Sequence, residues 1–160
     1  MLGKDLFCLP PRDGGTVVRT LFVSHEVLGD VEGPFSPDFT GHRLGRFRGT
    51  LDAFTRGNWV SIASDPYAKK PWAYFAPVDP VDLDIWDIRS VSPRPQIRCF
   101  GAWAEKNTFV ALTWKWRDDI DRFSDEAKEC RAEWNRIFPS CPPYRGKTLN
   151  DYITERCRVV

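Results

Sequence analysis

The chain has 160 residues, which is a usual length for one domain and is enough to bury a core without disulfides or structural metal. Its 42% hydrophobic, 14% aromatic and 28% charged residues are typical of a folded globular protein. The net charge of +1 does not by itself indicate nucleic-acid binding, so any electrostatic argument depends on where charges cluster.

The spacing of the cysteines and the length of the apolar runs indicate which cellular compartment and which cofactors to expect. The five cysteines are widely spaced and form no Cys-x-x-Cys pair, which predicts reduced thiols rather than a disulfide framework or a zinc site. An acidic loop site on Asp30, Glu32 and Asp38 is disfavoured, because acidic loop residues are normally solvated. No run approaches the roughly 18 apolar residues of a membrane span. We therefore expect a cytoplasmic protein with no membrane partner, no metal and no cofactor.

The first elements of the chain are predicted from apolar periodicity. One strand is predicted over 16–24, followed by a loop rich in Gly, Pro and Asp. A helix is predicted over 42–56, because four apolar residues recur at steps of three and four. These residues are Leu44, Phe47, Leu51 and Phe54. Gly45 and Gly49 weaken this helix. A short strand over 58–64 precedes an irregular apolar segment broken by prolines.

Three consecutive strands dominate the second half of the prediction. They cover 83–90, 96–104 and 108–116, and the short turns between them are typical of an antiparallel meander. An amphipathic helix is predicted over 117–138, and Pro139 ends it. The predicted fold class is therefore α+β, with an antiparallel sheet of three to five strands packed against a helix from the N-terminal half and a C-terminal helix.

Four of the seven tryptophans lie in the three-strand unit, at positions 86, 103, 114 and 116. Tryptophans on strands pack in a core more often than they stack on a nucleobase. We assign only Trp116 to a ligand surface, because it ends a strand between two basic residues.

The chemistry that the sequence offers is basic. No nucleotide-binding, zinc-protease or serine-hydrolase signature is present. The remaining candidates are Arg89, Arg94, Arg98, Lys106, Lys115 and Arg117. A guanidinium binds phosphate bidentately and stabilises the negative charge that develops when a ribose 2′-hydroxyl attacks phosphorus, so RNA cleavage needs no metal here. The alternative is that these cations only keep the sheet soluble and blunt its edge.

The segment 83–134 resembles the C-terminal half of the RelE/ParE toxin superfamily, in particular its phage-derived HigB-like branch. The matching segments, in chain order, are DIR (87–89), IRC (97–99), TFVAL (108–112), KWR (115–117) and DEAKECR (125–131). The resemblance implies a RelE-like fold in a single domain over 1–160. Its core would cover 41–138, between an unassigned N-terminal extension over 1–40 and a Pro-rich tail over 139–160.

The resemblance also implies an activity and partners. The activity is that of a toxin-like, metal-independent endoribonuclease that cuts messenger RNA, often at the ribosome, and the implied protein partner is a cognate antitoxin. Carried over by position, Arg98 contacts the scissile phosphate, Arg89 supports it, and Lys115 and Arg117 grip the RNA backbone or stabilise the transition state. The further candidates for substrate binding are Trp116, Lys106, Arg94 and Arg46.

Two departures from the family pattern keep other functions open. Trp116 splits the basic pair, and no histidine lies in the matched segment to act as a general base. One alternative is a non-catalytic protein that uses the same basic strand face to bind a protein partner or nucleic acid. Another is a domain that keeps the fold without the site. Ion pairing of the four catalytic candidates with neighbouring aspartates would disfavour an active site, and the sequence leaves the oligomeric state open.

Overall fold

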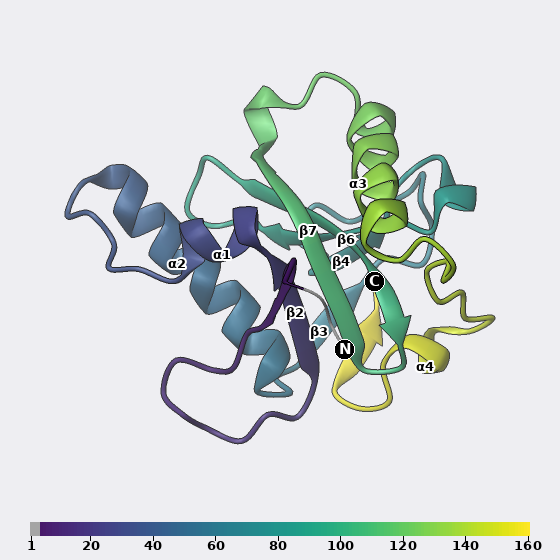
Figure 1. The fold of residues 1–160 in the computed structure, drawn as a ribbon, viewed down its shortest axis with the longest axis horizontal. Helices are drawn as coiled ribbons and strands as arrows, with labels where there is room; N and C mark the ends of the chain where they lie inside the picture. The colour runs from purple at the N-terminus through teal and green to yellow at the C-terminus, as the bar shows by residue number, and fades with distance from the viewer. Residues whose placement is uncertain (1–3) are drawn as a thin grey trace.

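An eight-stranded mixed sheet organises the chain in the computed structural model, which describes residues 4–160 (Figure 1). The strand order is β1-β2-β7-β6-β5-β4-β3-β8. The strands are β1 Leu6–Cys8, β2 Thr20–Ser24, β3 Val60–Ile62, β4 Phe75–Pro77, β5 Trp86–Ser90, β6 Ile97–Glu105, β7 Thr108–Trp116 and β8 Cys157–Val159. The helices are α1 His25–Val31, α2 Phe39–Thr55, α3 Phe123–Ile137 and α4 Leu149–Tyr152, with 3₁₀ turns at Val81–Leu83 and Arg117–Asp119.

The sheet is larger and less regular than the sequence predicted, although the α+β class is confirmed. β5, β6 and β7 form the expected antiparallel meander. However, β2 runs parallel to β7, and β3 runs parallel to both β4 and β8, so the expectation of three to five antiparallel strands is wrong. Except for β3 and β4, these parallel pairs join strands that are far apart in the sequence, and local alternation carries no information about such pairing.

Both ends of the chain belong to the sheet and do not flank a separate core over 41–138. β2 lies beside β7 and β1 pairs with β2 at one edge, while β8 pairs with β3 at the opposite edge. The buried Arg19 links these regions, because its Nη2 donates to the backbone carbonyl of Glu155 at 2.7 Å. The predicted extension and tail are therefore structural parts of the same sheet.

Caps and turns set the helix ends. Asp38 accepts a hydrogen bond from the backbone N–H of Gly41 at 2.9 Å, which starts α2 earlier than the apolar periodicity predicted. Gly57, with φ of +74°, follows the end of α2 in the left-handed conformation that glycine favours. α3 starts later than predicted, at Phe123, because Arg117–Asp119 forms a 3₁₀ turn.

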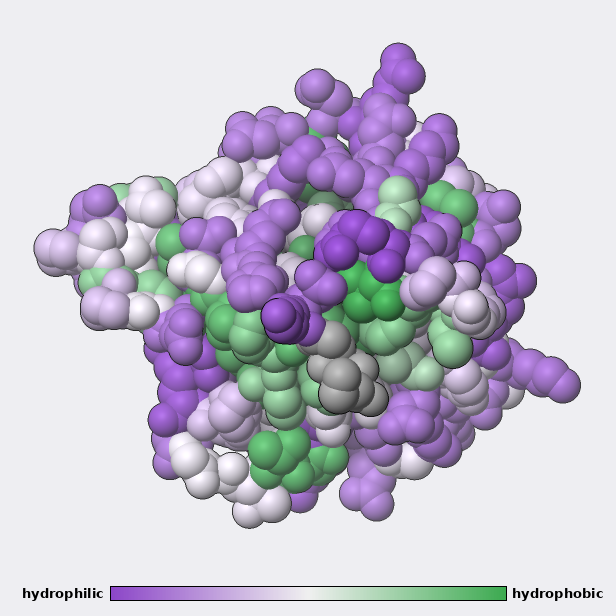
Figure 2. Space-filling view, viewed as in Figure 1, coloured by the Kyte–Doolittle hydropathy of each residue, from purple (hydrophilic) through white to green (hydrophobic). Residues whose placement is uncertain are grey.

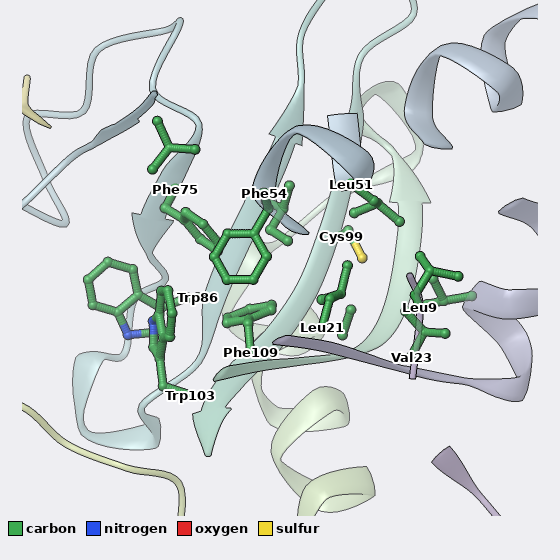
Figure 3. Close-up of a cluster of buried hydrophobic side chains, with 14 of the residues drawn as sticks. Leu9, Leu21, Val23, Leu51, Phe54, Phe75, Trp86, Cys99, Trp103 and Phe109 are labelled. Carbon is green, nitrogen blue, oxygen red and sulfur yellow. The ribbon is translucent and has the colours of Figure 1, made fainter. Parts of the chain in front are cut away.

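Hydrophobic cores fill both faces of the sheet, with α1 and α2 over one face and α3 over the other (Figure 1). The core under α2 is rich in aromatic rings (Figure 3). Its aromatic members include Phe54, Phe75, Trp86, Trp103 and Phe109. The prediction that strand tryptophans pack in a core is thus confirmed for Trp86 and Trp103. Among residues 4–160, no helix is long and apolar enough to cross a membrane.

Candidate functional site

Three of the four predicted catalytic residues lie in one cross-strand row on the α3 face of the sheet. Arg98 is directly opposite Arg89 on β5 and opposite Lys115 on β7. Alternation along β6 places Arg98 on the same side as Phe100, which packs in the core under α3. Arg117 joins this region, where its guanidinium carbon lies 4.9 Å from the ring centre of the first residue of α3. The structure therefore brings the four basic residues together.

Carboxylates already pair with three of these four cations. Asp87 is fully buried between Arg89, with Nε–Oδ1 at 3.1 Å, and Arg98, with Nε–Oδ2 at 3.5 Å. The two guanidinium side chains are each only 7% exposed. Lys115 Nζ contacts Glu126 Oε1 on α3 at 2.7 Å. Such ion pairing of the cations with carboxylates disfavours an open active site at this row.

Arg98 is the least satisfied member of the row. Its Nη2 donates to Gln96 Oε1 at 3.0 Å, whereas Nε and Nη1 are buried without a hydrogen-bond partner among the described residues. Burial lowers the pKa of Arg98 to about 10; the Asp87 charge opposes this shift, and the Arg89 charge adds to it. The Lys69 ammonium lies close enough to feel the same charges, and burial lowers its pKa as well.

The predicted substrate-binding residues do not form one surface with this row. Trp116 is half-buried on the opposite face of the sheet, 5.4 Å from Trp114 between ring centres. Lys106 is exposed in the turn at the far end of the β6–β7 hairpin, and Arg94 is exposed in the loop between β5 and β6. Arg46 lies on α2, where it borders a different site.

A basic groove, here called the α2 groove, runs between α2 and β3. It has a volume of about 580 Å³. Its lining is Arg12, Gly45, Arg46, Gly49, Thr50, Ala53, Trp59, Val60, Ser61, Trp72, Tyr74, Arg89, Val91, Ser92 and Arg158. Four of these residues are arginines and, of the described residues that line the groove, none is acidic. Asp52 and Asp87, which lie outside this lining, pair with Arg12 and Arg89, so the positive charge that stays unpaired within residues 4–160 is that of Arg46 and Arg158.

Three of the four arginines of the α2 groove are accessible to a ligand, whereas Arg89 is buried and paired with Asp87. Arg46 and Arg158 are exposed, and neither forms an ion pair within residues 4–160. Arg12 is 44% exposed and is held by its Nε, which donates to Asp52 Oδ2 at 2.9 Å. In the described part of the chain its two terminal nitrogens make no hydrogen bond. Asp52 therefore orients the Arg12 side chain, and the terminal nitrogens remain free to donate to a ligand. The Tyr74 phenol in this wall is neutral at neutral pH, and burial raises its pKa further.

Two tryptophans border the α2 groove with exposed rings. Trp59 is 69% exposed and Trp72 is 58% exposed. The Lys70 ammonium lies 5.9 Å from the centre of the Trp72 ring. Tryptophans with this much exposure, close together, are typical of a binding surface. Sequence reasoning missed both, because each stands at the margin of a short element and outside any periodic pattern.

Two glycines of α2 face the groove without a packing reason. A Cβ on Gly49 would meet only Arg12 Nη2, at 3.8 Å, and one on Gly45 would meet only the ring of Phe35, at 3.5 Å or more. Both are ordinary contacts, although each helical glycine costs about 1 kcal/mol relative to alanine. The glycines leave this side of α2 flat beneath the arginines.

Within residues 4–160, no group of three or more His, Cys, Asp or Glu side chains is placed to hold a metal ion. Comparison with known proteins adds no relative: no family model, no curated protein and no solved structure matches this chain. The likeness to RelE/ParE toxins therefore stays a hypothesis that rests on short sequence motifs. The structure itself defines an α+β protein with a mixed sheet and a basic, aromatic groove.

Proposed function

We propose that the protein binds single-stranded nucleic acid in the α2 groove. The observation that carries this proposal is one cavity that combines three accessible arginines, Arg12, Arg46 and Arg158, with two exposed tryptophans and has no acidic residue in its described lining. Guanidinium groups bind phosphate oxygens, and flat aromatic rings stack on bases whatever the sequence. A duplex would hide the faces of its bases, so the tryptophan rings favour a single strand.

The chemistry of the groove also separates nucleic acid from an acidic protein segment. An acidic segment, for example from an antitoxin, would satisfy the arginines but would leave the faces of Trp59 and Trp72 without a stacking partner. Stacking on an aromatic side chain contributes about 1–3 kcal/mol per base, which is comparable to the contribution of a phosphate contact. RNA is the form that the toxin resemblance implies.

Fluorescence anisotropy with a labelled single-stranded RNA, and with DNA of the same sequence, tests this proposal. We expect binding that weakens as salt rises, because the arginines displace counterions from the phosphates. Replacing Arg46 and Arg158 together with alanine should weaken binding and flatten the salt dependence by roughly 0.7 per lost phosphate contact on logarithmic axes.

The matched control is Arg145→Ala, which also removes an exposed arginine but one that pairs with Asp84 at 2.6 Å away from this groove. It should bind as the parent protein does. Equal binding by the double variant and the parent would contradict the assignment of the groove. Failure of the parent protein to bind any single strand at low salt would contradict the proposed function as a whole.

Metal-independent RNA cleavage is a second candidate function, favoured by one specific observation. The buried Arg98 keeps two guanidinium nitrogens without a hydrogen-bond partner in the described residues, and the charges of Arg89, Lys69 and Arg117 act on this region beside the single carboxylate of Asp87. A phosphate that entered this region would satisfy the free donors and offset the excess positive charge. This is the position at which the toxin resemblance also placed the scissile phosphate.

Incubation of messenger RNA with the protein in the presence of EDTA, with and without ribosomes, tests this candidate. Cleavage should be lost in Arg98→Lys, a variant that keeps the charge opposite Asp87 but removes the planar donor array. Circular dichroism and urea unfolding establish that the variant is folded. Intact RNA under both conditions, with the parent protein, would rule out this activity and leave the binding proposal unaffected.

A further inference from the structure

A second hollow continues from the α2 groove toward the N-terminal end of α2. It has a volume of about 660 Å³ and is bordered by Phe35, Phe39, His42 and Pro93. It shares three lining residues with the α2 groove, namely Arg12, Gly45 and Arg46. Like the groove, this hollow has no acidic residue in its described lining.

The surface of the second hollow is apolar as well as positively charged. The Phe39 side chain is 61% exposed at the first residue of α2. This end of α2 projects from the body of the protein (Figure 1), and its surface is largely pale, with hydrophobic patches (Figure 2). The second hollow thus places an exposed phenylalanine beside Arg46, which has no ion pair within residues 4–160, as the α2 groove places exposed tryptophans beside arginines.

One continuous side of α2 faces both hollows. His42, Gly45, Gly49 and Ala53 recur at steps of three and four, so they share one side of the helix, opposite the side packed on the sheet. Arg46 adjoins this side where the two hollows meet. The two hollows are therefore the two ends of one channel along the helix.

We propose that this channel binds a stacked single strand of about four or five nucleotides, and not only a single nucleotide or dinucleotide. The proposal rests on the proposed function, because it extends the same site. From His42 to Ala53 the helix axis rises about 17 Å, a length that about five stacked nucleotides span at about 3.4 Å each. The ligand class is thus a short linear stretch of single-stranded RNA or DNA.

The two ends of the channel bind different bases of the strand through different aromatic side chains. Trp59 and Trp72 stack bases in the α2 groove, while Phe39 stacks a base in the second hollow. Arg46, where the hollows meet, holds the phosphates between them, and Arg12 is a second residue that lines both hollows. A ligand that is too short to reach Phe39 should depend on the tryptophans alone.

A length series of labelled uridine oligonucleotides, from about two to about twelve nucleotides, tests the inference by anisotropy or displacement. Affinity should rise steeply up to about five nucleotides and then change little. Phe39→Ala should weaken binding of the longer oligonucleotides roughly 5- to 100-fold and leave the dinucleotide unaffected. Trp59→Ala should weaken binding of both. Tyr67→Ala, which removes another exposed ring (78% exposed) outside the channel, should change neither.

The outcomes separate this inference from the proposed function. Equal affinity for the dinucleotide and the longer strands, or an equal effect of Phe39→Ala on both, would overturn the extended channel and leave binding in the α2 groove intact. Absence of binding at every length would overturn the proposed function. Because Phe39 is largely exposed, the alanine variant should fold normally, and circular dichroism checks this directly.

Discussion

The two basic regions of this protein differ in what their arginines contact. On the α3 face, Arg89 and Arg98 are buried and share the Asp87 carboxylate. In the α2 groove, Arg46 and Arg158 are exposed and have no ion-pair partner within residues 4–160. Both regions are rich in positive charge, but only the second presents that charge to solvent beside exposed rings.

Burial explains why the difference matters. Taking a guanidinium out of water costs several kcal/mol, so a buried arginine needs a carboxylate and hydrogen bonds to be tolerated. An exposed arginine needs no partner and keeps its donors for a phosphate. A basic motif in a sequence therefore indicates ligand binding only where its cations are free of internal carboxylates.

The largest expected effect is on stability and concerns Asp87. Asp87→Ala leaves Arg89 and Arg98 buried without a counter-charge, which should lower the free energy of unfolding by about 3–5 kcal/mol. Urea unfolding followed by tryptophan fluorescence measures this change. The control, Asp121→Ala, removes an exposed aspartate and should stay within about 0.5 kcal/mol of the parent protein. A stable Asp87→Ala variant would show that the ionic row does not support the fold.

The next effect is on binding and concerns the exposed tryptophans. Trp59→Ala or Trp72→Ala should each reduce affinity for a single strand by about 1–3 kcal/mol. Because both rings are largely exposed, the free energy of unfolding should change by no more than about 0.5 kcal/mol. Loss of stability without loss of affinity would mean that these rings support the fold and do not bind a ligand. The α2 groove would then not differ in role from the buried row on the α3 face.

A smaller and opposite pair of effects is expected at Gly49. Gly49→Ala should raise the free energy of unfolding by about 1 kcal/mol, because the added Cβ meets no obstacle and alanine favours the helix. The same variant should weaken nucleic-acid binding, because the methyl group narrows the groove. Gly29→Ala in α1 is the matched control, since a Cβ there meets nothing within 4 Å. It should stabilise similarly without changing the affinity.

The smallest expected effect is a pH dependence at the start of α2. Hydrogen bonds from the Ser36 hydroxyl and then from the Gly41 N–H hold the pKa of Asp38 below its usual value. The folded state therefore favours the ionised carboxylate, so the contribution of Asp38 to stability is complete above a pH of about 4 and is lost as the pH falls further. The melting temperatures of the parent and Asp38→Ala should differ at neutral pH and converge in acid. A constant difference would show that the charge of Asp38 has no part in the cap.

Local pattern accounts for the parts of the fold that the sequence predicted well. Alternation in the segments that became β5, β6 and β7, and steps of three and four in α2 and α3, depend on neighbouring residues alone. The strands β2 and β3 lie inside the strands predicted over 16–24 and 58–64, but their parallel pairing and the strand β8 could not be predicted this way, because such pairing depends on contacts between separate segments. The same reasoning found Arg46 but missed Trp59, Trp72 and Arg158, which only the folded chain brings together.

The sequence by itself determined the α+β class, the three-strand meander, the core positions of Trp86 and Trp103, and the abundance of basic residues around β5 to β7. Only the tertiary structure decided which of those basic residues remain free. Periodicity reports which side of an element a residue occupies, but a counter-ion such as Asp87 and the depth of burial depend on how elements pack. For that reason the candidate site lies in the groove beside α2 and not at the strand motifs.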